Sequence, residues 1–315
     1  MVTLPWENQT VVEFILKGFS SMPELNIFLF MTFLVLYILI ISGNTLIVLL
    51  VLFSRPLHTP MYFFLVNLSF LEIWYTSNIV PNMLLIILAR RKTISVAGCL
   101  AQFYFFGSLA ATECLLLAVM SYDRYLAVCQ PLHYPILMTG PFCIRLAASS
   151  WLCCFLLTTI TMVPLSRLTF CGPSEIDHFF CDFAPLVHLS CMDSSLTETI
   201  AYVTSSAVTL IPFLFITASY SCILAAILRI PCGTGRQKAC STCSSHLTVV
   251  MVFYGTLIAT YLVPSANSSQ LLRKGFSLLH TILTPMLNPI IYSLRNRDIH
   301  EAMKKCLSKK PGFLR

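Results

Sequence analysis

Long stretches without a charged side chain recur along the sequence. Five stretches contain no Asp, Glu, Lys or Arg: residues 25–54, 146–166, 199–228, 247–272 and 275–294. Two more, residues 56–89 and 93–122, contain one carboxylate each, Glu72 and Glu113. A membrane-spanning helix needs about 20 mostly apolar residues in succession. The pattern therefore predicts seven spanning helices, at about residues 25–53, 57–86, 94–122, 143–164, 198–228, 242–264 and 275–294.

The composition agrees with a chain that lies mostly in a bilayer. Of its 315 residues, 57% are apolar and 10% are charged, and the mean hydropathy is +0.81. An ordinary soluble domain carries about 25% charged residues. Seven helices of roughly 22 residues take up about half of the chain, which leaves no room for a soluble enzyme domain. The expected fold class is an all-α membrane protein, a seven-transmembrane helix bundle.

Charges and one sequon indicate which end of the chain faces outward. Lys and Arg are retained preferentially on the cytoplasmic side of a membrane. With the N-terminal residues 1–24 outside, 13 of the 20 Lys and Arg side chains fall on the cytoplasmic side, and residues 295–315 supply the excess. Asn8 begins a glycosylation sequon on the proposed outer face. No cleavable signal peptide is expected, so the first span would act as its own insertion signal.

Most of the 14 cysteines lie in apolar stretches, where a free thiol behaves as a small hydrophobic side chain. Four others are expected outside, where disulfides form: Cys99 at the outer end of the third helix, and Cys171, Cys181 and Cys191 in the long loop after the fourth. Four cysteines allow three pairings, and the spacing does not choose among them. The alternative is a soft metal site that adds the two histidines of this loop. Disulfides are the default expectation, and no metal or cofactor is predicted.

Five motifs occur in register with the predicted helices. An Asp-Arg pair at a helix end is, by itself, typical of an interfacial ion pair, but here it belongs to a larger set. The motifs are GN at 43–44, PMYFFLVNLS at 60–69, MSYDRYLAVC at 120–129, KACSTCSSHL at 238–247 and PMLNPIIYSLRNRDI at 285–299. Together they resemble the signature set of the odorant receptors, a branch of the rhodopsin-like G-protein-coupled receptors. The resemblance extends from the first helix to the tail.

The resemblance implies a location, partners and roles for particular residues. It places the protein in the plasma membrane and implies an odorant ligand, a stimulatory olfactory-type Gα that raises cAMP, and no nucleic-acid partner. It pairs Cys99 with Cys181 and Cys171 with Cys191. In the resting state Asp123 would hold Arg124, which outward movement of the sixth helix would release. The residues expected to serve activation and coupling are Asp123, Arg124, Tyr125, Tyr220, Asn288, Pro289 and Tyr292.

Three polar residues are expected at a similar depth inside the bundle. At 1.5 Å per residue, Glu113 lies about 15 Å above Asp123, and Glu72 and Asn44 lie about 16 Å above the inner ends of their helices. Two carboxylates and an amide at one level are able to share a proton or bind Na⁺, because like charges in contact cannot both stay ionised cheaply. The alternative is that each carboxyl group is protonated and hydrogen-bonded as a packing contact. The family usually has Asp at the position of Glu72, which weakens the transfer of an ion site.

Receptors of this architecture bind small ligands between the outer halves of the third, fifth, sixth and seventh helices. The residues expected to line that region are Phe103, Phe106, Gly107, Ala110, Ala111, Thr204, Ser205, Val208, Leu257, Ile258, Tyr261, Leu278 and Thr281. This lining is apolar with a few hydroxyl groups, which suits a small hydrophobic molecule oriented by one or two hydrogen bonds. No Asp occupies the outer half of the third helix, so an amine ligand is not expected.

The last residues of the chain are predicted to lie along the membrane surface. Residues 295–315 are basic and amphipathic, which predicts a short eighth helix on the lipid of the inner leaflet, with Cys306 as a candidate for palmitoylation or a structural thiol.

An intramembrane enzyme is disfavoured because the sequence has no G-x-S-x-G, H-E-x-x-H or G-x-G-x-x-G motif. A cation-coupled transporter is disfavoured because no half of the chain is repeated and the number of spans is odd.

Overall fold

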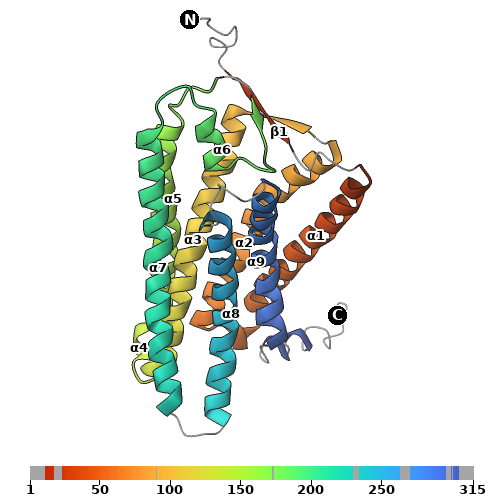
Figure 1. Cartoon of the computed structure of the whole chain (residues 1–315). Helices are drawn as coiled ribbons and strands as arrows, with labels where there is room; N and C mark the ends of the chain where they lie inside the picture. Colours follow the sequence, from red (N-terminus) through yellow and green to blue (C-terminus); the bar gives the residue numbers. More distant parts are fainter. Residues whose placement is uncertain are drawn as a thin grey trace, which may run out of the picture. The chain divides into compact units, whose positions relative to one another are not determined.

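The chain folds mainly into long helices, with short strands near β1 (Figure 1). The computed structural model describes residues 11–17, 23–89, 91–171, 174–229, 234–262, 270–295, 299 and 301–304. The elements, in chain order, are β1 (Glu13–Lys17), α1 (Pro23–Phe53), a 3₁₀ helix (Arg55–Leu57), α2 (Pro60–Ala89), β2 (Arg91–Ser95), α3 (Val96–Cys129), α4 (Tyr134–Leu137), α5 (Gly140–Leu165), β3 (Glu175–Ile176), α6 (Phe183–His188), α7 (Ser195–Arg229), α8 (Thr234–Leu262) and α9 (Gln270–Arg295).

The apolar stretches of the sequence fall in the long helices. Within the described residues, five helices are long and apolar enough to cross a membrane, those at Asn26–Phe53, Pro60–Ala89, Val96–Cys129, Gly140–Leu165 and Ser195–Arg229. In α8 the apolar part is shorter, Cys243–Ile258. The prediction of a helical membrane protein is confirmed. The count of seven spans stays a prediction, and most of the proposed tail helix, with Cys306, lies outside the described residues.

The expectation of an entirely helical chain misses a small three-stranded sheet, ordered β2-β1-β3. β1 pairs antiparallel with β2, with Glu13 opposite Ser95 and Lys17 opposite Arg91, and parallel with β3. Along β1 the side chains of Phe14 and Leu16 are fully buried, whereas their neighbours are not. This alternation of buried and open positions is the period of a strand, but five residues are too few for the sequence pattern to reveal it.

Two compact units make up the chain. The first consists of Met1–Ile38, Trp74–Cys114 and Ser150–Ile211. Its apolar core brings together Phe14 and Leu16 of β1, Phe103 of α3, and Phe170 and Cys181 of the loop after α5. The rings of Phe14 and Phe170 meet edge to face at 5.3 Å between centroids. The N-terminal strand is therefore part of the core of this unit.

The second unit consists of Leu39–Ile73, Leu115–Ser149 and Pro212–Arg315. Here α1 and α9 approach closely at Gly43, where an added Cβ would lie 3.1 Å from the Cβ of Pro289. α8 packs along α9, and Ile223 and Ile227 of α7 form a buried cluster with Cys243 of α8. This unit contains all seven residues predicted to serve activation and coupling.

Candidate functional site

The end of α3 carries a buried carboxylate that is held from two sides. Asp123 is 1% exposed, and its Oδ2 accepts hydrogen bonds from Nε of Arg124, at 3.0 Å, and from an Nη of the same guanidinium. Its Oδ1 accepts a hydrogen bond of 2.8 Å from the phenol of Tyr134. Both carboxylate oxygens are thus occupied, and the arginine is fixed beside α3 with 14% of its side chain exposed.

Tyr134 reaches Asp123 because the chain folds back after α3. α4 begins at Tyr134, whose N–H donates to the carbonyl of Gln130 at 3.1 Å. Burial, followed by the negative charge of Asp123, raises the pKa of the Tyr134 phenol. The phenol therefore stays protonated at neutral pH and remains a hydrogen-bond donor to the carboxylate. Tyr134 lies five residues after the MSYDRYLAVC motif, and nothing in the spacing indicated this contact.

A second polar contact joins α7 to α8. The hydroxyl of Tyr220 lies 2.6 Å from Nδ1 of His246, and the two rings stack with 5.7 Å between centroids. Tyr220 also packs, together with Tyr125 and Cys129 of α3, against the cluster around Ile223. The predicted coupling residues Tyr125 and Tyr220 therefore meet at one cluster that α3, α7 and α8 share. His246 was not predicted, although it is the second-last residue of the KACSTCSSHL motif.

The polar residues predicted in the bundle interior divide between the two units. In the second unit, Asn288 donates a 2.5 Å hydrogen bond to Oε1 of Glu72, and Asn44 donates to the carbonyl of Pro285. Asn44, Glu72 and Asn288 are all buried. Glu113 is also buried but belongs to the first unit. The structure thus connects Glu72 to Asn288, a partner that the sequence did not suggest, and the ion or proton site stays a prediction.

Eight of the residues predicted to contact a ligand belong to the first unit. They are Phe103, Phe106, Gly107, Ala110, Ala111, Thr204, Ser205 and Val208. Phe103 and Phe106 are buried, whereas Ser205 is exposed. Thr204 lies 3.0 Å from the hydroxyl of Thr161 on α5, so its side chain already has a polar partner. A Cβ at Gly107 would lie 3.4 Å from Thr158.

The other predicted ligand contacts belong to the second unit. Leu278 and Thr281 of α9 are buried, Leu257 of α8 is partly buried, and Ile258 is 47% exposed. A hydrogen bond of 3.0 Å joins Thr256 to Nδ1 of His280, one residue before Thr281. The side chains of Tyr261 and Tyr292 lie outside the described residues, as does the sequon at Asn8.

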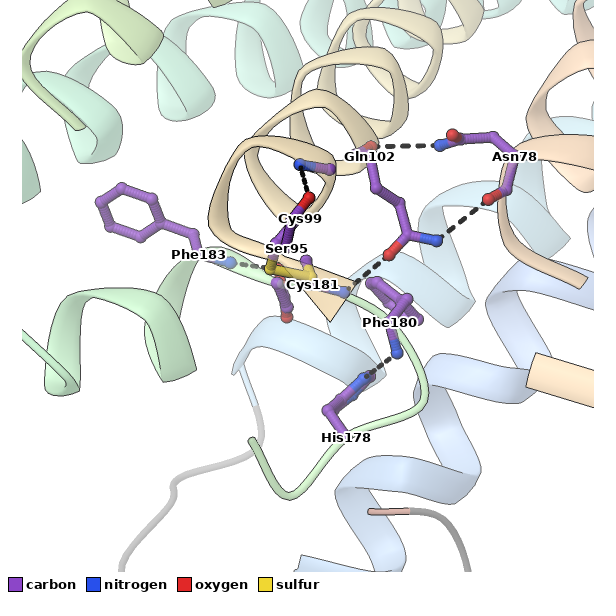
Figure 2. Close-up of a disulfide and its surroundings, with 10 residues drawn as sticks. Asn78, Ser95, Cys99, Gln102, His178, Phe180, Cys181 and Phe183 are labelled. Atoms are coloured by element: carbon purple, nitrogen blue, oxygen red, sulfur yellow. Dashed lines mark hydrogen bonds between the residues drawn. A yellow bond between two sulfur atoms is a disulfide. The ribbon is translucent and has the colours of Figure 1, made fainter. Parts of the chain in front are cut away.

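Two disulfides fasten the loop that follows α5. Cys99 pairs with Cys181, and Cys171 pairs with Cys191, the pairing that the family resemblance implied. Because both bonds use up the four sulfurs, none of these cysteines is a thiolate metal ligand. The surroundings of Cys181 hold three residues that the sequence did not single out, Asn78, Gln102 and Phe180 (Figure 2). The one signal for them in the sequence was an amide side chain in an apolar stretch, three residues after Cys99.

Comparison with known proteins identifies what the chain resembles. A family model described as olfactory receptor matches residues 33–310. Human olfactory receptor 11A1 is 50% identical over 303 residues, which cover 96% of each chain. Human olfactory receptor 11H6 is 51% identical over 94% of this chain and 90% of its own. Mouse olfactory receptor 6B9 is 46% identical over 96% of both. The residues that the family model matches belong to both units and include every motif named above.

Proposed function

Because the chain belongs to the olfactory receptor family, we propose that it binds a small, mostly hydrophobic volatile ligand and activates a stimulatory olfactory-type G protein that raises cAMP. Membership makes it a G-protein-coupled odorant receptor, a multi-pass protein of the plasma membrane and a member of a non-enzyme family. An intramembrane enzyme and a cation-coupled transporter, the two alternative classes, have no support from these relatives.

The arrangement around Asp123 is the observation that carries the coupling proposal. Arg124 is held by one oxygen of Asp123 while Tyr134 occupies the other. A ligand shifts a conformational equilibrium only by binding its two states with different affinities. In this proposal, ligand binding favours a state in which α8 moves outward and Arg124 leaves Asp123. The freed guanidinium then helps to receive the C-terminal helix of Gα, and Tyr220 and Tyr292 close around the opening.

The chemistry of the predicted lining supports the ligand class. Phe103, Phe106 and Leu278 offer apolar surface, while Thr281 adds a hydroxyl. Burial of an unpaired polar group is costly, so a ligand with one or two polar atoms fits such a lining better than a charged one. The absence of an Asp from residues 96–112 removes the counter-ion that an amine would need. The same proposal includes lipid contact, an N-terminus outside the cell and glycosylation at Asn8. It also includes a Na⁺ or proton site at Asn44, Glu72 and Glu113.

The experiment that tests this function is cAMP accumulation in cells that express the chain with a stimulatory olfactory-type Gα. A panel of volatile compounds would be applied, with surface expression measured in parallel. We expect at least one compound to raise cAMP in the wild type and not in Arg124→Ala at equal surface expression. A panel without any response, in cells with confirmed surface expression, would contradict the proposed ligand class and coupling partner.

A further inference from the structure

Gln102 is a polar residue on the α3 face that carries Cys99. It is 4% exposed, and it lies three residues after Cys99, so both side chains are on one side of the helix. All of its polar side-chain atoms are engaged. Nε2 donates to the carbonyl of Asn78 at 3.0 Å, and Oε1 accepts from the N–H of Cys181 at 3.0 Å (Figure 2).

The contact with α2 fixes which way the Gln102 amide points. The side chain of Asn78 donates in return to the backbone carbonyl of Gln102 at 3.1 Å, which makes the pair reciprocal. A carbonyl accepts hydrogen bonds and cannot donate them, so the NH₂ group of Gln102 must face Asn78. The oxygen of the Gln102 amide then faces Cys181. The oxygen and nitrogen of an amide are nearly alike in shape, so this orientation is assigned from their hydrogen-bond partners.

Cys181 is therefore held to α3 at two points, its sulfur and its backbone N–H. The disulfide joins it to Cys99 and the hydrogen bond joins it to Gln102. One bond through a side chain still allows the loop backbone to turn about the cysteine. A second attachment at the amide removes that freedom and sets the direction in which the preceding residue, Phe180, leaves the loop.

Phe180 packs directly against a predicted ligand contact. Its ring lies 5.0 Å from the ring of Phe106, and His178 meets it edge to face at 4.4 Å. On α2, Tyr75 packs with Phe106 at 5.6 Å. Phe106 is thus enclosed between a helix and the loop, and Phe180 is itself 1% exposed. A change in the direction of Phe180 would change the space beside Phe106.

We propose that Gln102 is a positioning residue for ligand selection: it orients the loop at Cys181 so that Phe180 closes against Phe106, and Phe180 thereby sets the size of ligand that the receptor accepts. The inference rests on the proposed function, because Phe106 is a proposed ligand contact. It adds to that function Phe180, which selects the ligand, and Gln102, which acts through Phe180.

Two substitutions at Gln102 separate its two contacts. Gln102→Leu removes the acceptor for Cys181 and the donor for Asn78, while the disulfide stays in place. Gln102→Glu keeps an oxygen that accepts from Cys181, and its carboxylate has no hydrogen to donate to Asn78. If the acceptor is what positions the loop, Glu restores what Leu removes. A residue that merely fills space would be replaced better by Leu than by Glu.

Hydrogen–deuterium exchange of the full-length receptor in lipid nanodiscs tests the positioning without a ligand. We expect the peptide that spans residues 178–183 to exchange about tenfold faster in Gln102→Leu than in the wild type, because one ordinary hydrogen bond corresponds to about that factor. In Gln102→Glu the exchange should stay close to that of the wild type. Equal exchange in the wild type and Gln102→Leu would overturn the positioning role, whatever the receptor responds to.

Ligand selection is then read as thermal stabilisation of the purified receptor by a homologous series of volatile compounds of increasing length, a measurement that needs no G protein. We expect Phe180→Ala and Gln102→Leu to move the best compound to a longer one, while Phe179→Leu, a change in the adjacent buried ring, keeps the wild-type rank order. An unchanged order in Phe180→Ala would overturn its selecting role. If no compound stabilises the wild type, both the proposed ligand class and the selecting role fail, and the exchange result still decides the positioning.

Discussion

The side-chain amide of Asn44 on α1 donates a 3.2 Å hydrogen bond to the backbone carbonyl of Pro285 on α9. That carbonyl lies four residues before Pro289, whose ring nitrogen has no hydrogen to donate to it. Asn44 therefore supplies the donor that the proline removes from α9. The same amide also donates to the carbonyl of Ile40 in its own helix, so both of its hydrogens are used, and the bend that Pro289 permits is supported from a neighbouring helix.

Replacing Asn44 should destabilise the receptor. Asn44→Leu leaves the Pro285 carbonyl without a partner in a buried place, and such a loss costs about 1–3 kcal/mol. We expect a lower midpoint of thermal unfolding for the purified protein. Ser42→Ala is the matched control, because Ser42 is exposed and bonds only to a carbonyl of its own helix, that of Leu39. An equal effect of both substitutions would show that Asn44 does not support α9.

Two glycines should respond in opposite ways to the same substitution. At Gly43 an added methyl group would lie 3.1 Å from Pro289, whereas at Gly255 nothing lies within 4 Å. Gly43→Ala should overpack the contact between α1 and α9 and cost about 1–3 kcal/mol. Gly255→Ala should be neutral or stabilise α8 by up to about 1 kcal/mol. Thermal unfolding of both variants measures the difference, and a stabilising Gly43→Ala would argue against the close approach.

The N-terminal strand should depend on its apolar residues more than on its charges. Glu175 of β3 pairs with Lys17 and Arg91, and all three side chains are at least 30% exposed. Exposed ion pairs contribute about 0–1 kcal/mol, so Glu175→Gln should change stability little. Phe14 is fully buried, and truncation of a buried ring costs about 3–5 kcal/mol. Unfolding midpoints should fall far more in Phe14→Ala, and the reverse order would contradict the packing of β1.

Loss of the Tyr134 phenol should raise signalling without ligand. Tyr134→Phe removes the hydrogen bond to Oδ1 of Asp123, which weakens the support of the carboxylate that holds Arg124. One such bond corresponds to roughly a tenfold change in an equilibrium, so basal cAMP should rise by up to about that factor. Tyr37→Phe removes a similar hydroxyl contact, that with Ser77, far along the sequence from this site. Basal cAMP at the level of the wild type in Tyr134→Phe would contradict the restraining role.

The sequence predicted the class of fold because a membrane helix can be recognised from a long stretch of residues without charge. α1, α5 and α7 coincide with the clearest stretches, and no tertiary contact is needed to find them. The motif at residues 120–129 likewise identified Asp123 and Arg124, since these two neighbours in the chain also contact each other in space. Local features of this kind can be found without the structure.

Contacts between distant segments could not be predicted in the same way. Gln102 meets Cys181 across 79 positions and Asn288 meets Glu72 across 216. The sequence did not single out Gln102, and it indicated Asn288 only as a coupling residue. The partner of each depends on how helices and loops pack. β1 was missed for the same reason. Its two buried residues, Phe14 and Leu16, pack into a core built from distant segments of the chain.

The measurement that tests the central claim most directly is nucleotide exchange on a purified stimulatory olfactory-type G protein, catalysed by the receptor in nanodiscs with and without an active compound. The wild type should accelerate exchange when the compound is present. Arg124→Ala should lose that acceleration while the compound still raises its unfolding temperature, because binding and coupling use different residues. Acceleration by Arg124→Ala equal to that of the wild type would contradict the proposal that release of Arg124 from Asp123 couples the ligand to the G protein.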